Sequence, residues 1–314
     1  MHKILQENWF TRRLEKLKAK AKEVSLPGFY KIPIYDVVKF FINGIKKGYL
    51  PTRASSVAFN FVLALFPGII FLFTLIPYIP IENFQSEMLK TFENMLPHNA
   101  YHFLESTLKD IILKKNWGFL SFGALFSLFF TMNGIHSLIE GFNTTYHEID
   151  TRRWITQRLI SILLVFIIAS LVTIATLLII GSRSVLNNLV EDGVLEVGLV
   201  YYLIVLGKWF IIIIFHLIAI SFIYYLAPAK KRHWRFLTPG SILATFLSIV
   251  ASLIFSFVIN NFGQFNKLYG SIGTLMVVLM WTYFNSLALI FGFELNASIS
   301  NAQLKLNGGE KKSG

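Results

Sequence analysis

Residues 271–293 read SIGTLMVVLMWTYFNSLALIFGF, a stretch of 23 residues without a charged side chain. At about 1.5 Å per residue, a helix of that length spans roughly 34 Å, enough to cross the ~30 Å hydrocarbon core of a bilayer. Because lipid offers the backbone no hydrogen-bond partners, such a stretch must be helical. Five similar stretches precede it: 54–76, 117–139, 155–181, 199–226 and 236–259. None of the six contains Asp or Glu, and together they predict an all-α polytopic membrane protein with six transmembrane helices.

The composition supports this class. The chain has 314 residues, of which 54% are hydrophobic and only 15% are charged, against about 25% charged in an ordinary soluble domain. This balance excludes a disordered chain and argues against a soluble enzyme. Cysteine is absent from the sequence, which excludes disulfides, a thiolate nucleophile and cysteine-based metal sites.

The net charge of +12 is distributed unevenly across the predicted membrane. Six spans place both termini on one side, and the segments on that side, with Arg158 at the nearby helix end, hold 22 of the Lys and Arg residues. The segments on the other side hold 6. By the positive-inside rule, both termini are predicted to be cytoplasmic. The bias explains the positive charge without a nucleic-acid partner.

The chain is predicted to divide into three regions. Residues 1–53 form basic amphipathic helices on the anionic inner leaflet, although a solvated basic tail is the alternative. Residues 54–293 form the six-helix domain, whose 77–116 loop is expected to be a small external helical cap. Residues 294–314 form a cytoplasmic tail. The apolar stripes of the first region follow helical spacing: Phe10, Leu14, Leu17, Ala21 and Val24, then Ile34, Val38, Phe41 and Ile45.

Polar residues inside the spans are the candidates for function, because a polar side chain in lipid requires a partner or a purpose. Pro67 is expected to kink the first span and free a carbonyl. The remaining candidates fall in the inner-leaflet half by the predicted topology: Asn60, Asn133, His136, Asn285 and, just beyond span six, Glu294. They indicate either a polar cluster facing an inward-open cavity or hydrogen bonds between packed helices.

Two cations lie within or beside the spans. Arg158 is close to a cytoplasmic helix end and is expected to extend its charge to the headgroups. Lys208 lies about ten residues from the external end of span four. It either reaches the outer headgroups or contacts an anionic substrate. His216, deeper in the same span, is expected to be a hydrogen-bonded bundle histidine.

Span five carries small residues at every fourth position, which allow a neighbouring helix to approach closely. This pattern indicates packing, either within the chain or at the seam of a homo-oligomer, and a sliding surface is the alternative. The residues are Gly240, Ala244, Ser248, Ser252 and Ser256.

The sequence lacks the motifs of several enzyme classes. It has no GxxxxGK[ST] phosphate loop and no HExxH zinc motif. His98 and His102 lie four residues apart, but without a third ligand they are expected to be plain surface histidines. The other histidines are scattered over the chain. We therefore expect no metal, no cofactor and no enzymatic activity.

Three blocks of the sequence resemble the YihY/BrkB family of bacterial inner-membrane proteins. They are ASSVAFNFVLALFPG at 54–68, NGIHSLIEGFNTTYHEIDTRRWITQR at 133–158 and LYGSIGTLMVVLMWTYFNSLALIFGFELNA at 268–297. One difference lies at position 64, where this sequence has Ala and the family often has Ser. The residues that match the closing block are Tyr269, Gly270, Ser271, Gly273, Trp281, Gly292, Glu294, Leu295 and Asn296.

The resemblance implies an inner-membrane protein with an envelope or lipid-export role. The family's older ribonuclease label is a misattribution on this sequence, which shows neither a nuclease ligand set nor a domain to hold RNA. We expect a transporter-like protein that moves a lipid-type or anionic amphiphilic substrate, with membrane lipids as partners. One alternative is a scaffold that docks envelope proteins through residues 77–116. Another is an intramembrane enzyme, for which His136 with a nearby Ser is the only candidate pair.

Overall fold

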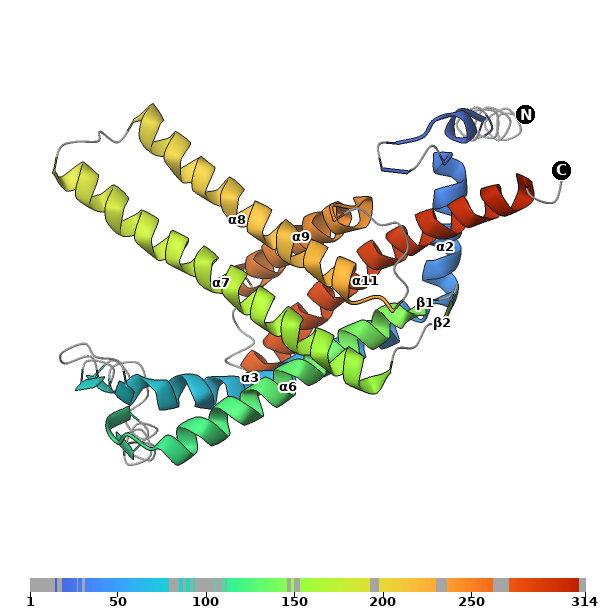
Figure 1. The fold of residues 1–314 in the computed structure, drawn as a ribbon. Coiled ribbons are helices and arrows are strands. Elements are labelled where there is room, and N and C mark those ends of the chain that lie inside the picture. Colours follow the sequence, from blue (N-terminus) through green and yellow to red (C-terminus); the bar gives the residue numbers. More distant parts are fainter. Residues whose placement is uncertain are drawn as a thin grey trace.

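The computed structural model describes residues 32–78, 112–145, 153–192, 198–229, 236–261 and 271–310, with shorter pieces at 15, 19–26, 28–29, 85–86, 89–90, 93, 105, 109–110 and 148–149. The chain is built almost entirely from helices in these regions (Figure 1). The helices are α2 (Ile34–Lys47), α3 (Leu50–Leu75), α6 (Trp117–Asn143), α7 (Trp154–Glu191), α8 (Leu199–Leu226), α9 (Pro239–Asn261) and α11 (Ser271–Glu310). A 3₁₀ turn, η1 (Ile76–Tyr78), follows α3, and β1 (Thr144–Thr145) pairs antiparallel with β2 (Glu148–Ile149).

The predicted class is confirmed, because six helices are long and apolar enough to cross a membrane. Only 6% of the apolar windows of α7 and α8 is buried within the protein. Large side chains such as Phe166, Leu206 and Phe210 are more than half exposed. Apolar helices with so little internal packing require lipid around them.

The sixth span differs from its predicted range of 271–293. Helix α11 continues to Glu310, and its apolar stretch runs from Leu275 to Leu304. Residues 294–304 contain enough polar groups to lower their hydropathy, but Glu294, Ala297 and Ser298 are buried against other helices. Glu294 therefore lies inside the bundle rather than just beyond it, and residues 294–310 are helical where a tail was predicted.

The spans are arranged as antiparallel pairs. Along α3 and α6, Gly141 meets Arg53, Ser137 meets Ser56 and Gly123 faces Phe71. Helices α7 and α8 form a second pair, and α9 packs along α11. Figure 1 shows the α3/α6 and α7/α8 pairs diverging as two arms from a shared centre, with both chain ends on the opposite side of the molecule.

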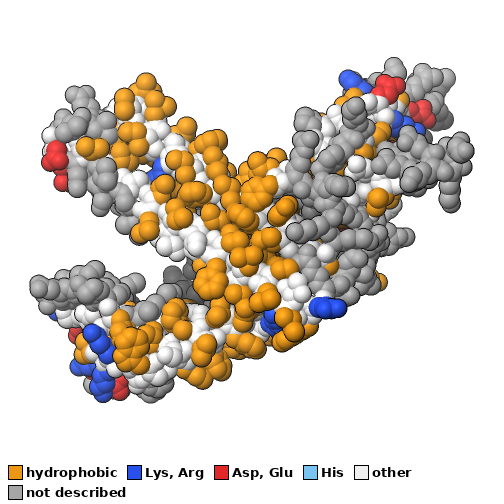
Figure 2. All heavy atoms as spheres, in the orientation of Figure 1, with side chains coloured by type: hydrophobic (Ala, Val, Ile, Leu, Met, Phe, Trp, Pro, Cys, Tyr) orange, Lys and Arg blue, Asp and Glu red, His pale blue; other side chains and the backbone are white. Residues whose placement is uncertain are grey.

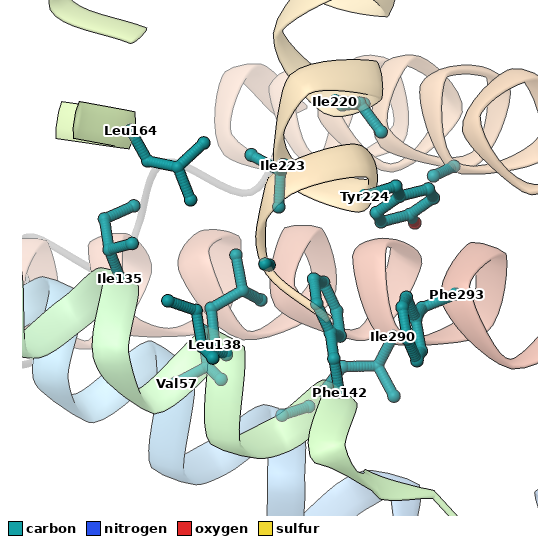
Figure 3. Close-up of a cluster of buried hydrophobic side chains, with 14 of the residues drawn as sticks. Val57, Ile135, Leu138, Phe142, Leu164, Ile220, Ile223, Tyr224, Ile290 and Phe293 are labelled. Atoms are coloured by element: carbon teal, nitrogen blue, oxygen red, sulfur yellow. The ribbon is translucent and has the colours of Figure 1, made fainter. Parts of the chain in front are cut away.

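The hydrophobic core lies where the six spans meet (Figure 3). The rings of Phe142 and Phe293 stack with centroids 4.2 Å apart, and Tyr224 packs edge-on to each of them. The Tyr224 hydroxyl donates a hydrogen bond to the Leu289 carbonyl. Every span contributes a buried side chain to this cluster, so the core fixes the bases of both arms.

Helix α2 packs against α11 rather than standing apart from the bundle. Phe29, Ile32 and Val37 form a small buried cluster with Ile299 and Ala302. Val38, which belongs to the predicted apolar stripe, is 44% exposed, so α2 has one side against the protein and a second apolar side facing outward. Its placement on the inner leaflet remains a prediction.

Other predicted features lie largely outside the described residues. These are residues 1–14 of the first amphipathic helix, most of the 77–116 cap with His98 and His102, and the family residues Tyr269 and Gly270.

Candidate functional site

A buried ion pair joins α3 and α11. Arg53 lies in the first turn of α3, and its Nη1 is 3.5 Å from Oε2 of Glu294 on α11. The two side chains are 9% and 0% exposed. Removing two charges from water is unfavourable unless they pair and are further hydrogen-bonded. The arrangement around Arg53 meets that condition.

The Arg53 guanidinium also binds the ends of two neighbouring helices. Its Nη1 donates to the carbonyl of Gly48, the C-cap residue of α2, at 3.2 Å, and its Nη2 donates to the carbonyl of Gly141 near the end of α6. Carbonyls at helix C-termini carry partial negative charge and lack partners within the helix, so a cation is favourable there. Arg53 therefore ties α2, α3, α6 and α11 together.

The Glu294 carboxylate sits directly against the backbone of α2. A Cβ added at Gly44 would overlap Oε1 and Cδ of Glu294. Only glycine allows this approach at position 44. The turn that leads from α2 into α3 places Tyr49 at φ 47°, the left-handed region, and so brings Arg53 back beside Gly48.

A second close contact joins α9 and α11. Cβ atoms added at Gly240 or Gly292 would overlap the backbone carbonyl of the other residue. The Asn296 side chain closes this seam, because its Oδ1 accepts from the Gly240 N–H at 2.9 Å and its Nδ2 donates to Thr238 Oγ1 at 2.8 Å. Gly292 and Asn296 belong to the family-like closing block, and here they hold α9 against α11.

The small-residue ladder of α9 continues this seam. Ser248 donates to Asn285 Oδ1 at 2.6 Å and lies 3.2 Å from the His216 ring, while Trp281 Nε1 donates to Ser252 at 3.2 Å. Ala244 is fully buried. Four ladder positions thus contact neighbouring helices of the same chain, whereas Ser256 is exposed. Gly273 is buried near the start of α11.

The predicted amides occupy separate places. Asn60 donates to the Ser56 carbonyl of its own helix at 2.9 Å, and Asn133 accepts from Arg158 Nη1 at 2.6 Å. Asn285 bonds to Ser248, as above. Among the described residues, no hydrogen bond connects these three amides to one another. Similar depth along the spans did not imply contact, because Asn60 bonds within α3, Asn133 bonds to α7 and Asn285 bonds to α9.

The remaining candidates lie apart from the ion pair. His136 Nε2 is 3.5 Å from Oε1 of Glu140 on the same helix. Pro67 is half-buried within α3, which continues through it to Leu75. The Lys208 ammonium lies 5.8 Å from the centre of the Trp209 ring. Within the described part of the chain, no three His, Asp or Glu side chains gather where a metal ion could bind.

Sequence reasoning missed Arg53, because residues 1–53 were treated as one interfacial segment. A signal was present: Arg53 directly precedes one apolar stretch and Glu294 directly follows another at the same predicted membrane face. Asn143, at a family-like position, also has a structural role, since its Oδ1 accepts from the Ala229 N–H at 3.1 Å.

Comparison with known proteins gives the family. The family model described as "Virulence factor BrkB" matches residues 41–314. The ribonuclease-like protein YfkH of Bacillus subtilis is 32% identical over 246 residues, which cover 78% of this chain and 88% of YfkH.

Two further relatives are named only as membrane proteins. The UPF0761 membrane protein of Tolumonas auensis is 23% identical, over 84% of this chain and 85% of its own. That of Xanthomonas campestris (strain B100) is 24% identical over 79% of this chain, which spans only 56% of the longer relative. No solved structure matches the chain. With six spans and a family match over most of its length, the chain belongs to the BrkB/YihY family of integral membrane proteins.

Proposed function

We propose that this protein moves a lipid-type or anionic amphiphilic substrate between the leaflets of the bacterial inner membrane, without a catalytic step of its own. The observation that supports this most is the open space between the two arms. Figure 2 shows it as a gap between the α7/α8 and α3/α6 arms, with hydrophobic side chains along each arm. Exposed apolar side chains on the arms suit the acyl chains of an amphiphile.

The two arms diverge from a closely packed region of the bundle, which we call the base. The core cluster, the Arg53–Glu294 pair and the α9–α11 seam all lie toward the end that holds the chain termini. The gap in Figure 2 opens at the other end, whereas the polar residues predicted an inward-open cavity. A rigid base with divergent apolar arms suits a protein that admits lipid from the side.

The proposed orientation places the termini in the cytoplasm. It rests on the 22 Lys and Arg residues of the termini side against 6 on the opposite side. In this orientation the arms open toward the outer leaflet, and the base of the bundle faces the cytosol.

A leaflet-exchange assay tests the proposal. The purified protein is reconstituted into vesicles of phosphatidylethanolamine and phosphatidylglycerol with a trace of tail-labelled fluorescent phosphatidylglycerol. Dithionite added outside bleaches only the label in the outer leaflet, so transfer of lipid from the inner leaflet adds a slow further loss of fluorescence. We expect this loss to be faster than in empty vesicles and in vesicles that hold an unrelated six-span protein. Equal rates in all three would contradict the proposal.

A further inference from the structure

A polar patch lies between α6 and α7, away from the Arg53–Glu294 pair. Arg158 of α7 donates through Nη1 to Asn133 Oδ1 of α6 at 2.6 Å, and its guanidinium carbon lies 5.6 Å from the centre of the Trp154 ring. His136 stands one turn from Asn133 on the same face of α6. The patch thus holds one fixed cation with an imidazole beside it.

The patch has unused hydrogen-bonding capacity. A guanidinium carries five N–H donors, and an imidazole has two ring nitrogens. In the described part of the chain, Arg158 Nε and His136 Nδ1 are buried without a hydrogen-bond partner. Buried polar atoms normally have partners, and leaving one without a partner is unfavourable. The Arg158 side chain is only half-buried as a whole, so an acceptor arriving from outside can approach its Nη groups, while the buried Nε stays covered.

The surroundings resemble a membrane–water interface next to an acyl-chain surface. Trp154 and Ile155, at the start of α7, are 66% and 65% exposed. The exposed side chains of Leu159, Leu163 and Phe166 continue from Ile155 along one face of the helix. Glu140 is the one negative group in contact with the patch among the described residues, and it contacts His136 rather than Arg158.

We propose that Arg158, held by Asn133 and Trp154, binds the phosphate of an anionic phospholipid headgroup. The acyl chains of that lipid lie along Leu159, Leu163 and Phe166. A guanidinium is well suited to this ligand because its planar fork can make two parallel hydrogen bonds to phosphate oxygens. In the orientation proposed above, the lipid comes from the cytoplasmic leaflet. Such a site would load the lipid that the protein moves, and this role rests on the proposed function.

Lipid binding to the purified full-length protein tests the site. Native mass spectrometry in detergent would compare the amount of phosphatidylglycerol bound with the amount of phosphatidylcholine bound. A second series would measure how far inorganic phosphate or glycerol phosphate displaces the bound phosphatidylglycerol. We expect phosphatidylglycerol to bind more tightly than phosphatidylcholine, and Arg158→Gln to weaken its binding roughly tenfold, since hydrogen bonds to charged groups are the strong ones. Arg158→Lys should give an intermediate loss, because it keeps the charge but not the fork.

Arg153→Gln is the matched control, because it removes the same charge from an exposed position directly before the same helix. It should leave phosphatidylglycerol binding within about twofold of wild type, as expected for a screened surface charge. Equal losses in Arg153→Gln and Arg158→Gln would overturn the site in favour of general surface charge. If free phosphate displaced phosphatidylglycerol at the same concentration at which the lipid binds, the ligand would be phosphate itself and not a lipid.

If Arg158→Gln fails to fold, photocrosslinking of the wild-type protein tests the site instead. Wild-type protein would be crosslinked to a phosphatidylglycerol analogue with a photoreactive group near its headgroup. Peptides within residues 129–140 and 153–166 should carry the label, and labelling confined to other regions would overturn the site. Binding without leaflet exchange would uphold the site while contradicting the proposed function, so the two failures are distinguishable.

Discussion

At the scale of single residues, the Arg53–Glu294 pair is the polar contact that connects the most helices among the described residues. The Arg53 charge is compensated by two helix-end carbonyls as well as by the Glu294 carboxylate. Such a pair adds little to stability compared with a hydrophobic replacement, but losing one partner leaves an uncompensated buried charge. The pair therefore specifies how α2, α3, α6 and α11 meet.

Single neutralisation of this pair should destabilise the protein strongly. We expect Arg53→Gln and Glu294→Gln each to lower the free energy of unfolding by about 3–5 kcal/mol. The double variant should lose clearly less than the sum, because neither charge is then left alone. Thermal or denaturant unfolding in detergent measures this effect.

The chain supplies its own control for that measurement. Lys109 and Glu105 form an exposed ion pair at 2.7 Å, and Lys109→Gln should change stability by less than about 1 kcal/mol. A similar small effect of Arg53→Gln would show that the buried pair does not hold the helices together.

Gly44→Ala tests the contact between α2 and the carboxylate. The added Cβ would collide with Glu294, so the melting temperature should fall even though alanine is the better helix former. Gly207→Ala in α8 is the matched control, because a Cβ there has no atom within 4 Å. It should stabilise the helix by up to about 1 kcal/mol. If both substitutions raise the melting temperature, the close packing of α2 is wrong.

At the scale of helices, the seam between α9 and α11 makes a similar prediction. Gly292→Ala would place a methyl group against the Gly240 carbonyl, the Ala244 side chain and the Tyr224 hydroxyl. The helices would have to separate, and we expect a loss of about 1–3 kcal/mol, typical of overpacking. Denaturant unfolding in detergent reports it.

Gly68→Ala in α3 is the comparison, because its added Cβ would meet only Ser127 Oγ at an ordinary 3.7 Å. It should be tolerated. Equal stability of the Gly292→Ala and Gly68→Ala variants would mean that α9 and α11 are not in close contact at Gly292.

The helices themselves could be predicted from sequence, but their partners could not. Length and hydropathy suffice to locate a span, since lipid forces the backbone into a helix. The sixth span is predicted to end before Glu294 because a carboxylate interrupts the apolar stretch, whereas the structure compensates that charge with Arg53, 241 residues away. No local pattern reports such a contact.

The candidate polar residues could likewise be identified from the sequence, but their partners could not. Asn133, His136 and Asn285 could be singled out as polar groups in spans, which is a property of sequence alone. That Asn133 binds Arg158 while Asn285 binds Ser248 depends on which helices are neighbours. The small residues of α9 did indicate close packing, because spacing by four places them on one helix face.

At the scale of the whole molecule, the architecture combines a packed base with two apolar arms (Figures 1 and 2). The base is held by the aromatic stack, the buried ion pair and the glycine seam. The α7/α8 arm buries little of its surface within the protein, whereas α3 and α6 bury more of theirs. This difference suits a protein whose arms contact lipid while its base stays fixed.

We propose that the base of the bundle and the Arg158 patch face the cytoplasm and that the arms open on the far side of the membrane. Reporter fusions in bacterial cells test it most directly. A green fluorescent protein fused after residue 314 should fluoresce, because it folds in the cytoplasm, and alkaline phosphatase fused after residue 195, between α7 and α8, should be active outside. An active phosphatase at residue 314 with an inactive one at residue 195 would contradict the account.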